Sequence, residues 1–126
     1  MNKNARLIAV SAALTLAFGT STAWAAKIGV SMSQFDDNFL TVLRGGMQTH
    51  AASLGDVQLQ FEDAQKDVGR QLNQMQNFIS AKVDAIIVNP VDTDATSKMT
   101  KLAAQAGIPL VYVNRVPADW KTLPPN

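Results

Sequence analysis

Apolar residues recur along the chain in two alternating patterns. Short strand-like apolar runs start near residues 27, 57, 84 and 110. Between them, apolar residues return every three or four positions, which is typical of amphipathic helices. One strand and one helix together take about 25 to 30 residues, the spacing of repeated strand–helix–strand units in a parallel sheet. The pattern therefore predicts an α/β fold: a doubly wound parallel sheet of order 2-1-3-4 in a three-layer αβα arrangement.

The predicted strands cover residues 27–31, 57–61, 84–90 and 110–114. The third has a continuous apolar run closed by Asn89-Pro90, which predicts a central strand buried on both faces. The predicted helices cover residues 38–54, 68–81 and about 92–106, and each has one apolar stripe expected to face the sheet. These stripes are Phe39, Leu43, Met47, His50 and Leu54; then Val68, Leu72, Met75, Phe78 and Ile79; then Ala95, Met99, Leu102, Ala103 and Ala106.

The first 25 residues have the organisation of a bacterial secretory signal peptide. Two basic residues precede an apolar run over residues 7–18, and Ala23-Trp24-Ala25 forms a small-residue cleavage site. The run is too short to cross a hydrocarbon layer of about 30 Å. We therefore expect cleavage after Ala25 and export to the periplasm.

Composition excludes several classes of function. The chain has no cysteine, and its 11 basic and 10 acidic residues nearly balance, so neither a cysteine-based metal site nor a nucleic-acid footprint is expected. The turn after the first strand lacks the G-x-G-x-x-G pattern of dinucleotide sites. His50 is the only histidine, and no nucleophile–base–acid set accompanies it. We expect no enzyme activity, no cofactor and no metal.

The candidate site lies where the strand order reverses, between strands 1 and 3. Ligands of open α/β sheets bind outside the carboxyl ends of the strands at such a point. The residues there are 31–37, 62–63, Asn89, Asn114 and Arg115. Asn89 is interpreted as a turn residue that ends its strand.

These side chains suit a polyol. Carboxylates accept hydrogen bonds from hydroxyl groups, an arginine donates to vicinal oxygens, an asparagine does both, and an aromatic ring covers the C–H face. We interpret Asp36 as the helix N-cap or a solvent-facing residue, and Asp37 as the hydroxyl acceptor. Phe39 starts the apolar stripe of its helix, so a core position and a stacking position remain equal alternatives.

Three stretches carry a family resemblance: KIGVSMSQFDDNFLTVLRGG, VDAIIVNPVDTDA and AGIPLVYVNRVP. In order and spacing they resemble the N-terminal lobe of periplasmic sugar-binding proteins of ABC importers, of the galactose-, ribose-, inositol- and rhizopine-binding types. The resemblance implies a two-lobed fold that closes on one monosaccharide or cyclitol. It also implies an ABC permease in the inner membrane as partner, and a chemoreceptor as a further one.

The resemblance assigns ligand contacts to Ser33, Phe35, Asp37, Phe39, Asn114 and Arg115. Asp37 would accept from a hydroxyl and Phe39 would stack on the ring. Galactose-type members carry an aromatic residue at the position of Ser33. In this chain Phe35 could supply that aromatic ring. The Asn114-Arg115 pair mixes the galactose-type and ribose-type patterns, so a pentose, a hexose and a cyclitol all remain open.

The expected organisation is a signal peptide over 1–25, an N-terminal lobe over 26–117 and an irregular tail over 118–126. Members of the family are about twice as long, as two lobes of ordinary domain size require. We therefore expect a truncated chain that binds its ligand weakly or not at all by itself. A sensing domain of a LacI-type transcriptional regulator, or of a chemotaxis sugar receptor, is the alternative. The regulator would need a helix-turn-helix where the signal peptide lies.

Overall fold

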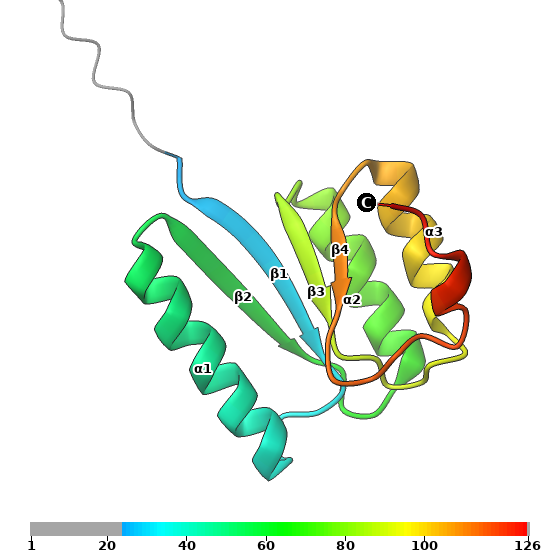
Figure 1. Ribbon diagram of the computed structural model, residues 1–126, viewed down its shortest axis with the longest axis horizontal. Coiled ribbons are helices and arrows are strands. Elements are labelled where there is room, and N and C mark those ends of the chain that lie inside the picture. Colours follow the sequence, from blue (N-terminus) through cyan, green and yellow to red (C-terminus); the bar gives the residue numbers. More distant parts are fainter. Residues whose placement is uncertain (1–23, 126) are drawn as a thin grey trace, which may run out of the picture.

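The computed structural model describes residues 24–125, which form one parallel sheet flanked by helices (Figure 1). The strand order is β2-β1-β3-β4, so the predicted fold class and order are confirmed. The strands are β1 (Ala26–Met32), β2 (Val57–Asp63), β3 (Ala85–Val88) and β4 (Leu110–Tyr112). The helices are α1 (Asn38–Leu54), α2 (Val68–Ser80) and α3 (Thr96–Ala106), with a short 3₁₀ turn, η1, at Trp120–Thr122.

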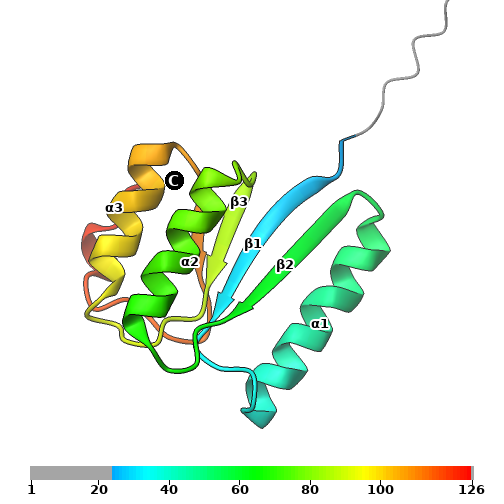
Figure 2. The ribbon, with the colours of Figure 1, turned by 180° about the vertical axis from the view of Figure 1, so that it is seen from behind.

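The helices lie in two layers around the sheet. Helices α2 and α3 lie together on one side, while α1 lies apart beside β2 and β1 (Figures 1 and 2). Val30 and Met32 of β1 pack against Leu40 of α1. The larger cluster joins β3, α2 and α3, with Met75 and Met99 fully buried at its centre. Those two methionines are core residues, as their stripe predicted.

Helix α2 packs very closely on β1 because Gly29 has no side chain. A Cβ atom built on Gly29 would lie 2.5 Å from Cγ of Phe78, which is itself buried. No real Cβ makes such a contact, so the ring occupies the space that any other residue would need. The glycine is thus required by packing rather than by backbone conformation.

The predicted buried stripe of α1 is confirmed at Leu43 and Met47, which pack against the cluster of β1, and is wrong toward its two ends. Leu40 and Ala51 are the buried residues of this helix, whereas Phe39 is 59% exposed and His50 and Leu54 are exposed as well. Leu40, Leu43, Met47 and Ala51 fit the same three- and four-residue spacing, so the stripe runs through Leu40 and Ala51 instead of Phe39 and His50. The core alternative for Phe39 is therefore excluded.

Strand β3 is buried on one face and only partly on the other. Ile86 and Val88 face α2 and α3 and are fully buried, whereas Ile87 is half-buried. The prediction of burial on both faces is wrong because α1 covers β1 and β2 but does not extend over β3 and β4. Val111 of β4, on the same uncovered face, is 56% exposed.

The third helix starts later than predicted, at Thr96. Before it, the Asp94 amide donates to Oδ1 of Asp92 (2.9 Å) and the Thr96 hydroxyl donates to the Thr93 carbonyl (2.7 Å). Such local bonds from short polar side chains compete with helix formation. The predicted tail is irregular apart from η1, and it is tied to this turn by the Ala118 amide, which donates to the Thr93 carbonyl.

No helix in the part of the chain that the structure describes is long and apolar enough to span a bilayer. The predicted signal peptide and its cleavage site fall almost entirely outside the described residues. They therefore stay predictions, as do the domain boundaries that depend on them.

Candidate functional site

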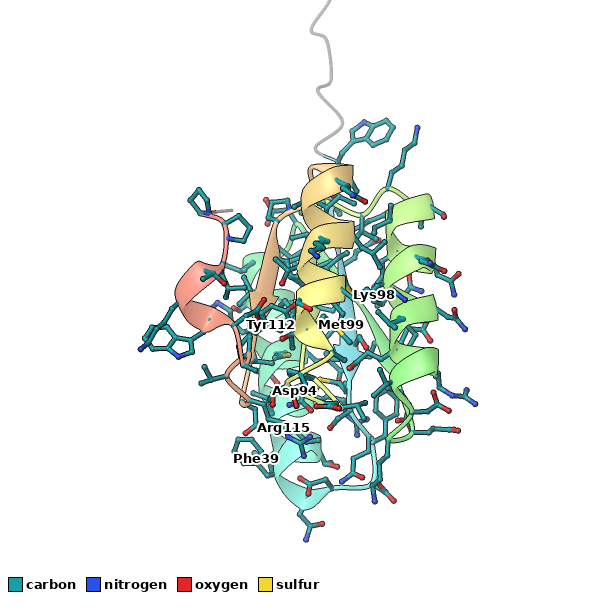
Figure 3. All side chains as sticks on the ribbon, turned by 90° about the vertical axis from the view of Figure 1, so that its right-hand side faces the viewer. Phe39, Asp94, Lys98, Met99, Tyr112 and Arg115 are labelled. Carbon is teal, nitrogen blue, oxygen red and sulfur yellow. The ribbon has the colours of Figure 1, made fainter. Side chains whose placement is uncertain are left out.

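The carboxyl ends of the strands meet at one edge of the molecule, toward which the arrows of Figure 1 point. Figure 3 shows Phe39 and Arg115 at this end, although one comes from the start of α1 and the other follows β4. Strands β1 and β3 are neighbours whose connections leave on opposite sides of the sheet. This is the switch point at which open α/β sheets bind their ligands.

The start of α1 presents Asp37 and Phe39 at this edge. Asp37 is the N-cap: its Oδ1 accepts from the Leu40 amide over 2.9 Å. Of the two alternatives for Asp36, the cap is therefore wrong, whereas the solvent-facing position is confirmed because Asp36 is exposed. Within the described residues, Oδ2 of Asp37 makes no hydrogen bond, so one carboxylate oxygen stays available. The ring of Phe39 is exposed rather than packed in the core.

The segment after β4 brings Asn114 and Arg115 to the same edge. The Arg115 amide donates to the Val113 carbonyl over 2.7 Å and closes a three-residue turn around Asn114, whose φ is 66°. Asparagine is one of the few residues that tolerate this left-handed region. The turn directs Arg115 toward β3, where its Nη1 donates to the carbonyls of Pro90 (3.1 Å) and Val91 (2.8 Å).

The guanidinium is consequently anchored at one nitrogen only. Arginine carries five N–H donors in a planar fork, and the two carbonyls engage Nη1 alone. In the described structure, Nε and Nη2 of Arg115 make no hydrogen bond to protein. These two nitrogens are the ones that donate side by side to a pair of oxygens.

Ser33 is at the edge but its polar groups are already used. It is buried, its hydroxyl donates to Oδ1 of Asn89 (2.6 Å), and its amide donates to the same oxygen (3.2 Å). Asn89 in turn donates through Nδ2 to the Val113 carbonyl (3.4 Å). Asn89 does follow the end of its strand, but its side chain also ties β1, β3 and β4 together.

Phe35 is partly buried and packs against the core beside the start of α1. Its ring belongs to the cluster around Val30, Met32 and Leu40. The guanidinium of Arg44 lies 3.8 Å from the ring centroid and also donates to the Phe35 carbonyl over 3.2 Å. The cation–π contact and the carbonyl bond together fix the loop against α1.

Two buried glutamines of α2 complete the structure beneath this edge, and sequence reasoning missed both. Gln71 and Gln74 lie on the buried face of the helix with Met75 and Phe78. The Ser31 hydroxyl donates to Oε1 of Gln74 (2.7 Å), and Nε2 of Gln74 donates to the Asp63 carbonyl (2.8 Å). Positions 71, 74, 75 and 78 share one helical face, so their spacing was a signal for burial. The two glutamines were left out of the predicted buried stripe because they are polar.

Chemically, the edge offers an unpaired carboxylate oxygen, an amide, an arginine fork and an exposed ring. These groups can exchange hydrogen bonds with several neutral hydroxyls and cover an apolar ring face. Among the described residues there is no group of three or more His, Cys, Asp or Glu side chains that could hold a metal ion.

Comparison with known proteins agrees with this fold. The family described as "Periplasmic binding protein domain" matches residues 28–123, which is most of the chain. The chain belongs to this family. Its members among the relatives below are binding proteins for sugars and cyclitols rather than enzymes.

The chain is similar to three proteins of this kind. It is 57% identical over 118 residues to a "Putative rhizopine-binding protein" of Rhizobium meliloti, covering 94% of this chain and 37% of that protein. It is 32% identical over 119 residues to the D-galactose/methyl-galactoside binding periplasmic protein MglB of Haemophilus influenzae, covering 93% and 36%. An ABC transporter solute binding protein from Bacillus halodurans, solved with bound myo-inositol, shows 44% identity and a TM-score of 0.70, covering 76% and 33%.

The chain thus spans about a third of the length of the curated relatives that it matches. The sheet and helices formed by residues 24–125 correspond to one part of those longer proteins. What the whole relatives bind is a property of the full-length molecules.

Proposed function

We propose that this chain forms one wall of the ligand site of an ABC-importer solute-binding protein for a cyclitol or monosaccharide. One observation supports the proposal above the others. The exposed ring of Phe39 and the half-anchored guanidinium of Arg115 lie at the same edge of the sheet (Figure 3). An aromatic face beside a charged donor is a combination that a polyol satisfies and an apolar ligand does not.

Each residue would have a separate role. Oδ2 of Asp37 would accept from a hydroxyl while Oδ1 keeps its bond to the Leu40 amide. Nε and Nη2 of Arg115 would donate to two neighbouring ligand oxygens, and the Asn114 amide would add a donor and an acceptor. Phe39 would cover the C–H face of the ring.

Ser33 and Phe35, the other two residues expected at the site, would contribute from behind it. The hydroxyl of Ser33 is held by Asn89, and the ring of Phe35 is held under Arg44. Both side chains fix the loop that carries Asp37. We therefore propose that they support this loop and contact the ligand only with the part of their surface that reaches it.

Among the ligand classes left open by the sequence, we favour a cyclitol. Of the two relatives with the highest identities quoted above, one is named for rhizopine binding and the other was solved with bound myo-inositol. A cyclitol carries a hydroxyl or amine on every ring carbon, which suits an edge that alternates donors and acceptors. A pentose or hexose is the second candidate, in line with the galactoside-binding relative.

Export and transport follow from the same proposal. The galactoside-binding relative is named as a periplasmic protein. We infer that this chain is exported with cleavage after Ala25, and that the complete protein delivers its ligand to an ABC permease, with a chemoreceptor as a further partner.

Saturation-transfer NMR tests the proposal, because it detects weak contacts between a protein and small-molecule protons. The chain without residues 1–25 is incubated with myo-inositol, ribose, galactose or, as a control, succinate. We expect transfer to the ring protons of myo-inositol and its loss in Phe39→Ala, with folding checked by circular dichroism. Equal transfer to succinate, or transfer that Phe39→Ala leaves unchanged, contradicts the proposal.

A further inference from the structure

A single peptide group beneath Arg115 is held from both sides. The bond between Pro90 and Val91 has its N–H on Val91, which donates to Oε1 of Gln71 over 2.8 Å. Its carbonyl, on Pro90, accepts from Nη1 of Arg115 over 3.1 Å. In a trans peptide these two groups point in opposite directions, and the described chain contains no cis bond. The Gln71 carboxamide and the Arg115 guanidinium therefore bond to opposite edges of one rigid plane.

Gln71 also fixes the residues around this plane. It is fully buried on α2, and its Nε2 donates to the Asn89 carbonyl (3.0 Å) and to Oγ of Ser31 (3.0 Å). One carboxamide thus holds the peptide groups before and after Pro90 and joins them to β1. Proline has no N–H of its own, so its amide nitrogen adds no hydrogen bond to this segment.

Without Gln71 the plane would lose the bond that sets its rotation. The partly buried Val91 amide would be left without a partner, and a donor removed from water without a partner costs more than the net value of the bond itself. Rotation of the peptide toward another acceptor would relieve that cost. The same rotation would swing the Pro90 carbonyl away from the guanidinium, because N–H and C=O turn together.

We propose that Gln71 is a positioning residue that sets the place of the Arg115 guanidinium at the ligand edge. It does not reach the edge itself and acts through the Pro90–Val91 peptide. The inference rests on the proposed function for its binding consequence, while its structural consequence stands alone. It explains why a glutamine occupies a helix position whose neighbours Met75 and Phe78 are core residues.

Gln74 provides a matched control on the same helix. It is also buried and also bonds Ser31, but its second partner is the Asp63 carbonyl at the end of β2, away from Pro90 and Val91. Replacing either glutamine by methionine keeps the length of the side chain and removes its hydrogen bonds. A role confined to stability predicts similar results for both.

Two readouts on the chain without residues 1–25 test the proposal. The first is the hydrogen exchange of the Val91 amide together with the side-chain Nε–H resonance of Arg115. The second is the NMR titration affinity for myo-inositol. Gln71→Met should speed Val91 exchange, shift the Arg115 resonance and weaken binding about tenfold. Gln74→Met should change neither readout beyond the general loss of stability.

The outcomes separate the two claims. Equal effects of Gln71→Met and Gln74→Met, or an unmoved Arg115 resonance in Gln71→Met, overturn the positioning role. On an Arg115→Ala background, Gln71→Met should cause no further loss of affinity, and an additional tenfold loss also overturns it. If the wild-type chain binds no cyclitol or sugar, the proposed function fails while the exchange and resonance still decide the positioning. Should Gln71→Met not fold, Gln71→Asn, too short to reach Val91, replaces it with the same expectations.

Discussion

Ser33 and Asn89 join the loop after β1 to the end of β3. The Ser33 hydroxyl donates to Oδ1 of Asn89 over 2.6 Å, and both residues are buried. From the other side of its amide, Asn89 reaches the Val113 carbonyl after β4. The three strand ends that carry the candidate site are therefore held together by polar groups inside the protein. In a buried setting such bonds are costly to leave incomplete.

Asn89→Ala should lower the free energy of unfolding by about 2 to 3 kcal/mol. The substitution leaves the hydroxyl and amide of Ser33 without their shared acceptor. Urea denaturation followed by circular dichroism measures the effect. The exposed Asn77 of α2 serves as control, and Asn77→Ala should stay within about 0.5 kcal/mol of wild type. Similar losses in both variants would show that the Ser33–Asn89 pair does not stabilise this edge.

Gly29→Ala should destabilise the fold by about 1 to 3 kcal/mol, because its methyl group would overlap the buried ring of Phe78. Gly46→Ala is the matched variant. Gly46 lies in α1 with nothing near an added Cβ, so alanine should raise stability there by about 0.5 to 1 kcal/mol. The two melting temperatures should move in opposite directions. A neutral Gly29→Ala would mean that α2 can shift away from β1 at little cost.

Much of the fold could be predicted because its signals are local. Strand and helix periodicity and the lengths between them led to the correct order of the sheet. The errors arise where a tertiary contact decides. Phe39 and Leu40 both suit an apolar stripe, and only the position of α1 on β1 makes Leu40 the buried one.

The candidate site could be predicted in its outline but not in its support. Asp37, Phe39, Asn114 and Arg115 follow predicted strand ends, so their shared edge follows from topology. Gln71 could not be found in this way, since a glutamine gains a buried position only through partners distant in sequence, here 18 to 40 residues away. The cap lies at Asp37 rather than Asp36, a difference that reflects one residue of uncertainty at a helix start.

Substitutions of Asp37 should separate its role as helix cap from its proposed role in ligand binding. Asp37→Asn keeps a good N-cap, whereas Asp37→Ala removes the bond to Leu40 and should cost about 1 kcal/mol of stability. Both should weaken binding of myo-inositol, since both remove the carboxylate that would accept from a hydroxyl. Thermal melts and NMR titration measure the two effects.

The cap of α2 is the control for Asp37. Asp67 accepts from the Arg70 amide over 2.8 Å in the same way but follows β2 rather than β1. Asp67→Ala should cost a similar amount of stability and leave affinity unchanged. Full affinity in Asp37→Asn would assign Asp37 to capping alone.

Tyr112 should make stability fall at alkaline pH. Burial raises the pKa of its phenol; the hydrogen bond with Thr100 opposes that rise, and the negative charge of Asp119 adds to it. Because the folded state holds the proton more tightly, this contribution is complete below the unfolded pKa of about 10 and is lost as pH rises through the folded value.

Unfolding experiments between about pH 9 and 11 check this, with Tyr112→Phe as comparison. Tyr112 is the only tyrosine of the chain, so the variant removes every phenol and keeps every lysine. It should start about 1 kcal/mol less stable, having lost the bonds to Thr100 and to the Thr96 carbonyl. It should then lose less stability than wild type over this range. Parallel curves would contradict the raised pKa.

Binding of a polyol at the carboxyl edge of the sheet can be followed residue by residue in a ¹⁵N NMR titration with myo-inositol of the chain without residues 1–25. One wall leaves most of a ligand exposed, so we expect a dissociation constant of about a millimolar or weaker. We expect saturable shifts confined to the amides of residues 33–40 and 113–115 and to the Arg115 side chain. A folded spectrum with no saturable change at these positions, or with changes centred elsewhere, would contradict it.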